Sequence, residues 1–169
     1  MQITSQHMQD VLYQLFLKYR FSHKKAFLLA QTYTESTLAG VNSHGINRVP
    51  LFLEYVENGS VKINAEAEKV ESFGSIERWD GNYGPGIINA TKCTHRAVEL
   101  AKTHGMGLVA LRNTNHWMRG DVQDVEPMQP GDTIYYPGER SALAKEENLK
   151  NGMQVSDTVW EKIMAMSES

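Results

Sequence analysis

The sequence is poor in the residues that mark several common classes of protein. Cys93 is the single cysteine in 169 residues, which excludes an internal disulfide framework. No apolar run approaches the roughly 20 residues that a transmembrane helix needs. The polar first residues also lack the apolar segment of a secretory signal peptide. We therefore expect a cytoplasmic protein with no membrane partner.

Positive charge is scarce as well. The chain has 17 Lys and Arg against 20 Asp and Glu, a formal net charge of -3, and its basic residues are scattered. Such a surface has no positive field to attract nucleic acid or anionic lipid, so nucleic acid is not an expected partner. With 41% hydrophobic residues, the length suits one domain with a real core.

The usual patterns for metal and nucleotide binding are missing too. Close pairing at helical spacing and nearby carboxylates, typical of a zinc site, are lacking around four of the histidines: His44, His95, His104 and His116. No metal is therefore expected. Residues 81–86 are rich in glycine but have neither the Walker lysine nor a strand-GxGxxG-helix pattern, and we expect a turn that leads into a helix.

Apolar residues recur at helical spacing over most of the chain. With Thr4 or Ser5, Ser22 and Ser156 as caps and Pro50 and Pro85 in opening turns, this predicts helices over about 4–20, 22–40, 50–58 and 85–104. Short helices are expected at 143–149 and 159–164. Alternation over 67–80 predicts short edge strands with a turn at Gly74, and 107–111 predicts a buried strand. The fold class is therefore a helix-rich α+β domain.

Composition divides the chain into three parts. Residues 1–120 carry the periodic segments, whereas the acidic, proline-bearing stretch 121–136 has no periodicity and is expected to be a linker. Residues 137–169 form a helical tail, which we expect to pack on the N-terminal region.

The most informative motif places Ser43, His44 and Arg48 in one turn-prone segment, expected to be a loop. Adjacent side chains on a turning backbone point apart, which argues against activation of Ser43 by His44 and so against a hydrolase. A histidine near neutral pH can pass a proton to an oxygen, and an arginine can hold a carboxylate. The alternative is structural: a capped turn, a histidine bonded to carbonyl groups and a surface ion pair.

A second polar cluster follows the strand predicted at 107–111. It contains Asn113, Asn115, His116 and Trp117, at the end of a strand where open α/β sheets commonly bind ligands. Two segments distant in the sequence are therefore candidates for one pocket. The alternative for His116 is a packed, hydrogen-bonded side chain beside the tryptophan.

Three segments carry a resemblance to a known family. The run 40–48 (Gly-Val-Asn-Ser-His-Gly-Ile-Asn-Arg), the segment 107–120 with its Asn-His-Trp-Met-Arg-Gly end, and the tail 137–140 (Pro-Gly-Glu-Arg) are similar, in the same order, to the type-2 malate/L-lactate dehydrogenase family. The likeness extends over residues 1–120 and again over about 135–163. It implies a homodimeric oxidoreductase that moves hydride between NAD(H) or NADP(H), with NADH favoured, and a small carboxylate-bearing substrate. It also implies a fold distinct from the Rossmann domain.

The resemblance assigns roles by position. His44 matches the proton donor, Ser43 and Arg48 are expected beside the carboxylate and carbonyl of the substrate, and His116 lies in the matched cluster at the strand end. For the nicotinamide cofactor, the matched tail residues are Gly138, Glu139 and Arg140.

The chain departs from the family in its middle. Members continue after the segment matched by Gly120 with a long nucleotide-binding region before the matched tail, whereas here the fold would be internally truncated. Two functions therefore stay open: a reductase of 2-oxo acids, or a non-catalytic remnant that serves as a dimerisation or interaction module. An unrelated small-molecule binding protein would require three ordered matches to arise by coincidence.

Overall fold

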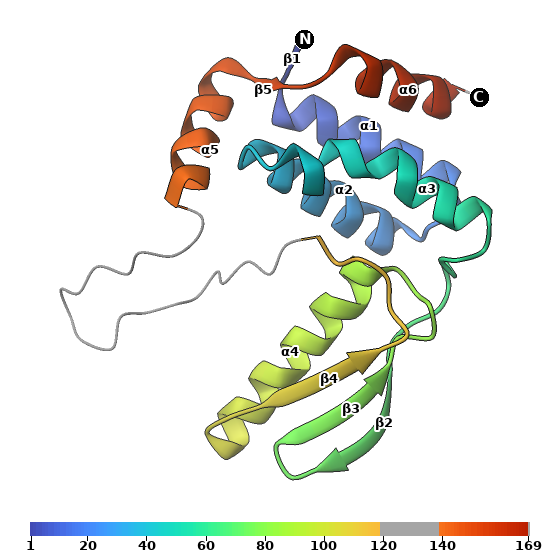
Figure 1. The fold of residues 1–169 in the computed structure, drawn as a ribbon, viewed down its shortest axis with the longest axis vertical. Coiled ribbons are helices and arrows are strands. Elements are labelled where there is room, and N and C mark those ends of the chain that lie inside the picture. The colour runs from blue at the N-terminus through green and yellow to red at the C-terminus, as the bar shows by residue number, and fades with distance from the viewer. Residues whose placement is uncertain (119–138, 169) are drawn as a thin grey trace, which may run out of the picture.

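A computed structural model describes residues 1–118 and 139–168 of the chain (Figure 1). Helices α1 (Ser5–Lys18), α2 (His23–Leu38) and α3 (Val49–Glu57) form one layer with α6 (Asp157–Glu168). Helix α4 (Gly86–His104) packs separately against a small sheet, and α5 (Glu139–Asn151) lies beside α2. The predicted helix-rich α+β class is confirmed.

Local capping explains where the helices begin and end. Thr4 Oγ1 accepts a hydrogen bond from the backbone N–H of His7 at 3.3 Å, and Ser22 Oγ accepts one from Lys25 at 3.4 Å. Each bond satisfies an amide that has no partner within its helix. Helix α4 ends at Gly105, whose φ of 81° suits glycine. The predicted boundaries of the first four helices are confirmed to within a few residues.

The core lies between helices α1, α2 and α3. Phe16 of α1 stacks on Tyr33 of α2 with ring centroids 5.8 Å apart, and it meets Phe52 of α3 edge to face at 6.0 Å. These aromatic side chains are almost fully buried, as predicted from their helical spacing. Such rings bury a large apolar area and fix the three helices relative to one another.

The small sheet contains β2 (Glu68–Phe73), β3 (Ile76–Asp80) and β4 (Leu108–Arg112), in that order. Strands β2 and β3 are an antiparallel hairpin, and α4 connects β3 to the parallel strand β4. The prediction that β4 is buried is wrong, because its residues alternate between exposed and half-buried. It lies at an edge of the sheet, and α4 covers only one face.

An ion pair joins α4 to the sheet. Glu77 of β3 is 1% exposed, and its carboxylate accepts hydrogen bonds from Arg96 Nη2 at 2.8 Å and from Trp79 Nε1 at 2.8 Å. These bonds, led by that from Arg96, lower the pKa of Glu77 to about 2. A buried carboxylate is tolerated here because both of its oxygens have donors.

The tail returns to the helical layer. Strand β1 (Gln2–Ile3) pairs antiparallel with β5 (Met153–Gln154), and α6 contacts α1 and α3. Helix α5 spans Glu139–Asn151 and so extends beyond the expected range 143–149 at both ends. The linker expected at 121–136 lies outside the described residues. No helix in the described ranges is long and apolar enough to cross a membrane.

Candidate functional site

The Ser43-His44 segment is not the loop expected but two short 3-10 helices, η1 (Asn42–His44) and η2 (Ile46–Arg48). They are joined by Gly45, which lies directly against α2. A Cβ atom at Gly45 would overlap Thr37 Oγ1 and would lie 2.8 Å from Thr37 N. Thr37 Oγ1 accepts a hydrogen bond from the N–H of Ile46 at 2.8 Å, which fixes the segment to the helix.

The tight winding of η1 brings together two side chains that were predicted to point apart. Ser43 Oγ lies 3.0 Å from His44 Nδ1, within hydrogen-bonding distance. The prediction was wrong because it assumed an extended or open-turn backbone, whereas 3-10 winding leaves less rotation between neighbours. The bond orients the His44 ring. Ser43 is exposed, so the pair lies at the surface of the site.

His116 reaches the site on the loop that follows β4. The loop is held against residues 81–86, where Asn115 Nδ2 donates to the carbonyl oxygen of Gly84 at 3.3 Å. At Gly86 a Cβ atom would overlap the carbonyl oxygens of Asn115 and His116, so the close approach requires glycine. Residues 81–86 thus form the predicted turn and helix start, and they support the loop that carries His116.

The two histidines predicted from separate motifs meet. The ring centroids of His44 and His116 are 5.2 Å apart with an angle of 47° between their planes. His116 Nδ1 accepts a hydrogen bond from the N–H of Met118 at 2.9 Å, so the proton of the neutral ring lies on Nε2. Partial burial, followed by the charges of Arg48 and His44, lowers the pKa of His116. The neutral Nε2–H form is therefore favoured.

Arg48 supplies positive charge to this pair of rings. It is half-buried at the start of α3, and no carboxylate within residues 1–118 and 141–168 pairs with its guanidinium. The surface ion pair considered from the sequence is therefore not formed with the described residues. A guanidinium that has no partner among the side chains described, beside two imidazoles, is suited to bind an external anion such as a carboxylate.

Tyr33 of α2 is a polar neighbour of Arg48. Its side chain is fully buried, and its hydroxyl has no hydrogen-bond partner within the described part of the chain. Burial raises its pKa, and the charge of Arg48 opposes that rise, so the hydroxyl lies within the field of the site. The signal in the sequence was a tyrosine in an otherwise apolar buried stripe.

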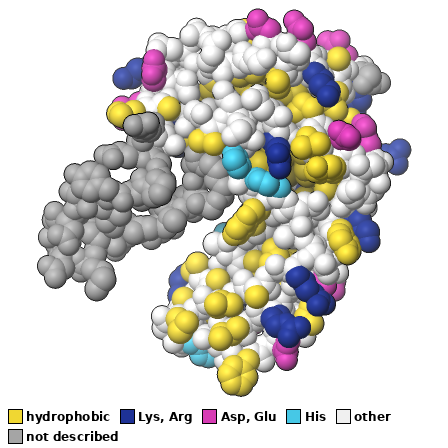
Figure 2. Space-filling view, in the orientation of Figure 1, with side chains coloured by type: hydrophobic (Ala, Val, Ile, Leu, Met, Phe, Trp, Pro, Cys, Tyr) yellow, Lys and Arg dark blue, Asp and Glu magenta, His cyan; other side chains and the backbone are white. Residues whose placement is uncertain are grey.

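The site lies where the helical layer meets the sheet. Figure 2 shows histidine side chains beside a basic one at this junction, with hydrophobic side chains on either side. Within the residues described, no group of three or more His, Cys, Asp or Glu side chains is arranged to hold a metal ion. The available chemistry is therefore that of two imidazoles, a hydroxyl and a guanidinium.

The C-terminal tail contacts the chain just before Ser43 and His44. Asn42 Nδ2 donates to the carbonyl oxygen of Gln154 at 3.3 Å, and a Cβ atom at Gly40 would lie 3.1 Å from Ala144 Cβ. Of the predicted cofactor residues, Gly138 lies outside the described residues. Glu139 and Arg140 begin α5, but their side chains are not described.

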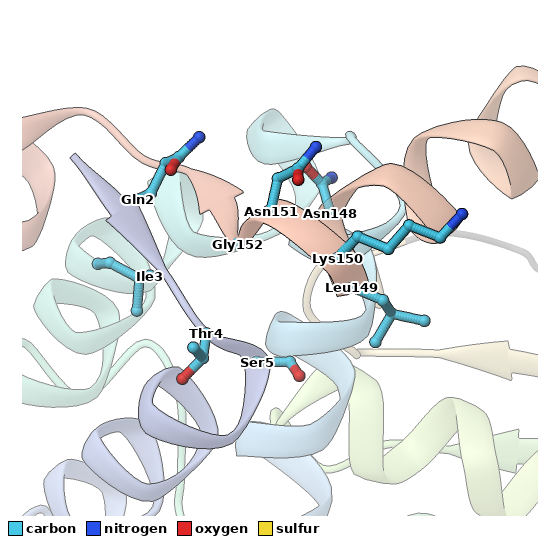
Figure 3. A pocket seen from close by; sticks show the side chains of 9 residues that line it. All are labelled: Gln2, Ile3, Thr4, Ser5, Asn148, Leu149, Lys150, Asn151 and Gly152. Atoms are coloured by element: carbon cyan, nitrogen blue, oxygen red, sulfur yellow. The ribbon is translucent and has the colours of Figure 1, made fainter.

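A separate pocket of about 330 Å³ marks the place where the tail meets the N-terminus (Figure 3). It lies between residues 2–5 and residues 148–152 and contains none of the predicted site residues. In Figure 3 the Lys150 side chain extends away from the strands. This pocket is a feature of the tail junction and is distinct from the histidine site.

Comparisons with known proteins match the same part of the chain. Residues 3–122 fit the malate/L-lactate dehydrogenase family profile. The 2,3-diketo-L-gulonate reductase of Salmonella heidelberg (strain SL476) is 40% identical over 120 residues, which are 71% of this chain. The chain spans 36% of the length of that relative.

Solved structures show the same fold. The malate dehydrogenase from Entamoeba histolytica matches with a TM-score of 0.66 and 27% identity, over 69% of this chain and 33% of that one. A dehydrogenase from Sinorhizobium meliloti matches with a TM-score of 0.84 over 99% of both chains. Its identity is 12%, so this likeness concerns the fold alone.

Proposed function

Because the chain belongs to the malate/L-lactate dehydrogenase family, we propose that it serves the NAD(P)H-dependent reduction of a 2-oxo acid of the 2,3-diketo-L-gulonate type. The observation that carries the proposal is the meeting of His44 and His116 beside Arg48, whose guanidinium has no carboxylate partner among residues 1–118 and 141–168. The substrate type rests on the relatives, since the site itself selects only for a small carboxylate-bearing molecule.

The residues divide the chemistry between them. Arg48 binds the substrate carboxylate and orients the keto group, and His116 offers its Nε2–H as a hydrogen-bond donor. His44, held by Ser43, protonates the developing alkoxide oxygen. A bound reduced nicotinamide supplies the hydride.

The cofactor side of the proposal rests on the family resemblance. NADH is favoured over NADPH, and Gly138, Glu139 and Arg140 remain the proposed contacts in the tail. A homodimer is proposed on the same basis. The expectation of a cytoplasmic protein stays a prediction.

One observation favours the second candidate function, a non-catalytic remnant or dimerisation and interaction module. The chain corresponds to 36% of the Salmonella relative, so most of that protein has no aligned counterpart here. Such a module would keep the fold and the histidine pair without turning over a substrate.

Titration of the purified chain with NADH, followed by nicotinamide fluorescence, separates the two functions. Addition of 2,3-diketo-L-gulonate should then oxidise the cofactor, and a His44→Ala variant should lose about 10²-fold or more in turnover. His95→Ala, an exposed position on α4, is the matched control and should leave turnover unchanged. A folded chain that neither binds nor oxidises NADH would support the module instead.

A further inference from the structure

Tyr33 carries a hydroxyl group at a position that a phenylalanine ring would fill equally well. Its ring lies among aromatic side chains, with centroids 5.8 Å from Phe16 and 5.9 Å from Phe52. The Tyr33 hydroxyl has no hydrogen-bond partner within the described part of the chain. Burial of an unpaired hydroxyl is unfavourable. The oxygen is therefore the part of this side chain that packing does not explain.

Two sets of contacts bring Arg48 close to this hydroxyl. Thr37 Oγ1 accepts a hydrogen bond from Ile46 N–H at 2.8 Å and donates to the carbonyl oxygen of Tyr33 at 2.8 Å. This joins η2, which ends at Arg48, to the turn of α2 that begins at Tyr33. Arg48 also lies one helical turn before Phe52, and side chains at this spacing share one face of a helix. Because the Tyr33 ring contacts Phe52, it lies beside the face that carries Arg48.

The charge of Arg48 acts on both Tyr33 and the histidine pair. Burial raises the pKa of the Tyr33 hydroxyl, and the charge of Arg48 opposes that rise. After burial of the ring, the same charge contributes to the lowered pKa of His116. Tyr33 is fully buried, whereas Arg48 is half-buried and His116 is exposed. A ligand can therefore reach the guanidinium but not the Tyr33 hydroxyl, so the hydroxyl can act on a ligand only through Arg48.

We propose that Tyr33 is a positioning residue for Arg48. When Arg48 binds the substrate carboxylate, the Tyr33 hydroxyl oxygen accepts a hydrogen bond from one guanidinium N–H while two others hold the carboxylate. A guanidinium has five N–H donors in a rigid plane, so this bond fixes the plane without competing with the anion. The neutral phenol also leaves the positive charge of Arg48 available to the ligand. The inference rests on the proposed function, since it concerns the binding of the same carboxylate.

Binding of pyruvate, a small 2-oxo acid, tests the inference without a cofactor. Tyr33→Phe should raise the dissociation constant about tenfold, the effect of losing a hydrogen bond to a charged group. Tyr55→Phe is the matched control, because it removes a hydroxyl from an exposed position on α3, and it should change affinity less than about twofold. In an Arg48→Met background, Tyr33→Phe should add less than about twofold, since the two residues act together.

The guanidinium N–H signals of Arg48 in proton–nitrogen NMR spectra give a readout that packing alone would not change. With pyruvate bound, one of these protons should exchange with water more slowly in the native chain and in Tyr55→Phe than in Tyr33→Phe. Circular dichroism checks that each variant is folded.

Three results would overturn the inference: no binding of pyruvate to the native chain, equal affinity of the native chain and Tyr33→Phe, or a tenfold effect that persists in Arg48→Met. With any of these, oxidation of NADH by 2,3-diketo-L-gulonate would still establish the proposed function. Conversely, pyruvate binding that depends on Tyr33 and Arg48 without any NADH oxidation supports the inference and counts against the proposed function alone.

Discussion

Arg48 places a positive charge beside two imidazole rings, and this arrangement disfavours a further positive charge on His116. The charge of Arg48 is the second cause of the lowered pKa of His116, after burial of the ring. Removal of the guanidinium should therefore raise that pKa toward its usual range. Protonation also requires His116 Nδ1 to give up the hydrogen bond from Met118 N–H, which opposes charging in the native chain.

The change to make is Arg48→Met, which keeps an unbranched side chain in the half-buried position. Titration of the imidazole nitrogens by two-dimensional NMR should show a higher His116 pKa than in the native chain. Binding of a small 2-oxo acid should weaken by about 1.5–3 kcal/mol, the contribution of a hydrogen bond to a charged group. The imidazole signals of His104, at the end of α4, serve as the internal reference for the spectra. An unchanged His116 pKa would mean that Arg48 does not act on the ring.

At the scale of the elements, Glu77 connects α4 to the sheet through Arg96. The pKa of Glu77 is about 2 in the folded chain, below its ordinary value of 4.5. Its ionised form therefore stabilises the fold fully above pH 4.5, and this stabilisation is lost as the pH falls from 4.5 to 2. Glu77→Gln should lower the free energy of unfolding at pH 7 by about 1–3 kcal/mol.

Urea unfolding followed by circular dichroism at pH 7 and at pH 3 measures this effect. The difference between the native chain and Glu77→Gln should shrink at the lower pH. Glu71→Gln is the matched control, because Glu71 pairs with Arg78 in an exposed position on β2. It should shift stability by less than about 1 kcal/mol. A difference for Glu77→Gln that stays constant with pH would show that its charge does not stabilise the contact with α4.

Elements whose ends depend on neighbouring residues could be predicted from the sequence. Thr4 and Ser22 cap their helices and Gly105 ends α4, because capping satisfies amides and carbonyls only a few residues away. The turn at 81–86 was also predicted, although its function as a support for the His116 loop was not. That function arises from a close approach at Gly86, which concerns residues distant in the sequence.

Two features of the site needed the structure. The contact between Ser43 and His44 depends on the 3-10 winding of η1, in which the N–H of Gly45 donates to the carbonyl oxygen of Asn42 at 3.1 Å. The apolar sequence of β4 predicts a strand covered on both faces. In the structure α4 covers only one face, so β4 is partly exposed. The meeting of His44 and His116 was inferred only as a convergence of two segments, since no local pattern sets the distance between them.

At the scale of the whole molecule, the tail completes the core of the helical layer. Ile163 of α6 is fully buried in the same cluster as Phe16 and Phe52, and Met153 of β5 is fully buried beside them. The α-amino group of Met1 donates to the carbonyl oxygen of Val155 at 3.1 Å. Because these contacts join the two ends of the chain, the tail and the N-terminal helices should unfold in a single transition.

Ile163→Ala tests this cooperativity. Loss of a buried isoleucine side chain should lower the free energy of unfolding by about 2–4 kcal/mol, through lost burial and the cavity left behind. Leu149→Ala on α5 is the matched control, since Leu149 is exposed, and it should change stability by less than about 0.5 kcal/mol. Amide hydrogen exchange should show lower protection in α1 and α6 together for Ile163→Ala. If protection fell in α6 alone while α1 kept its native protection, the tail would be an independently unfolding segment and not part of the core.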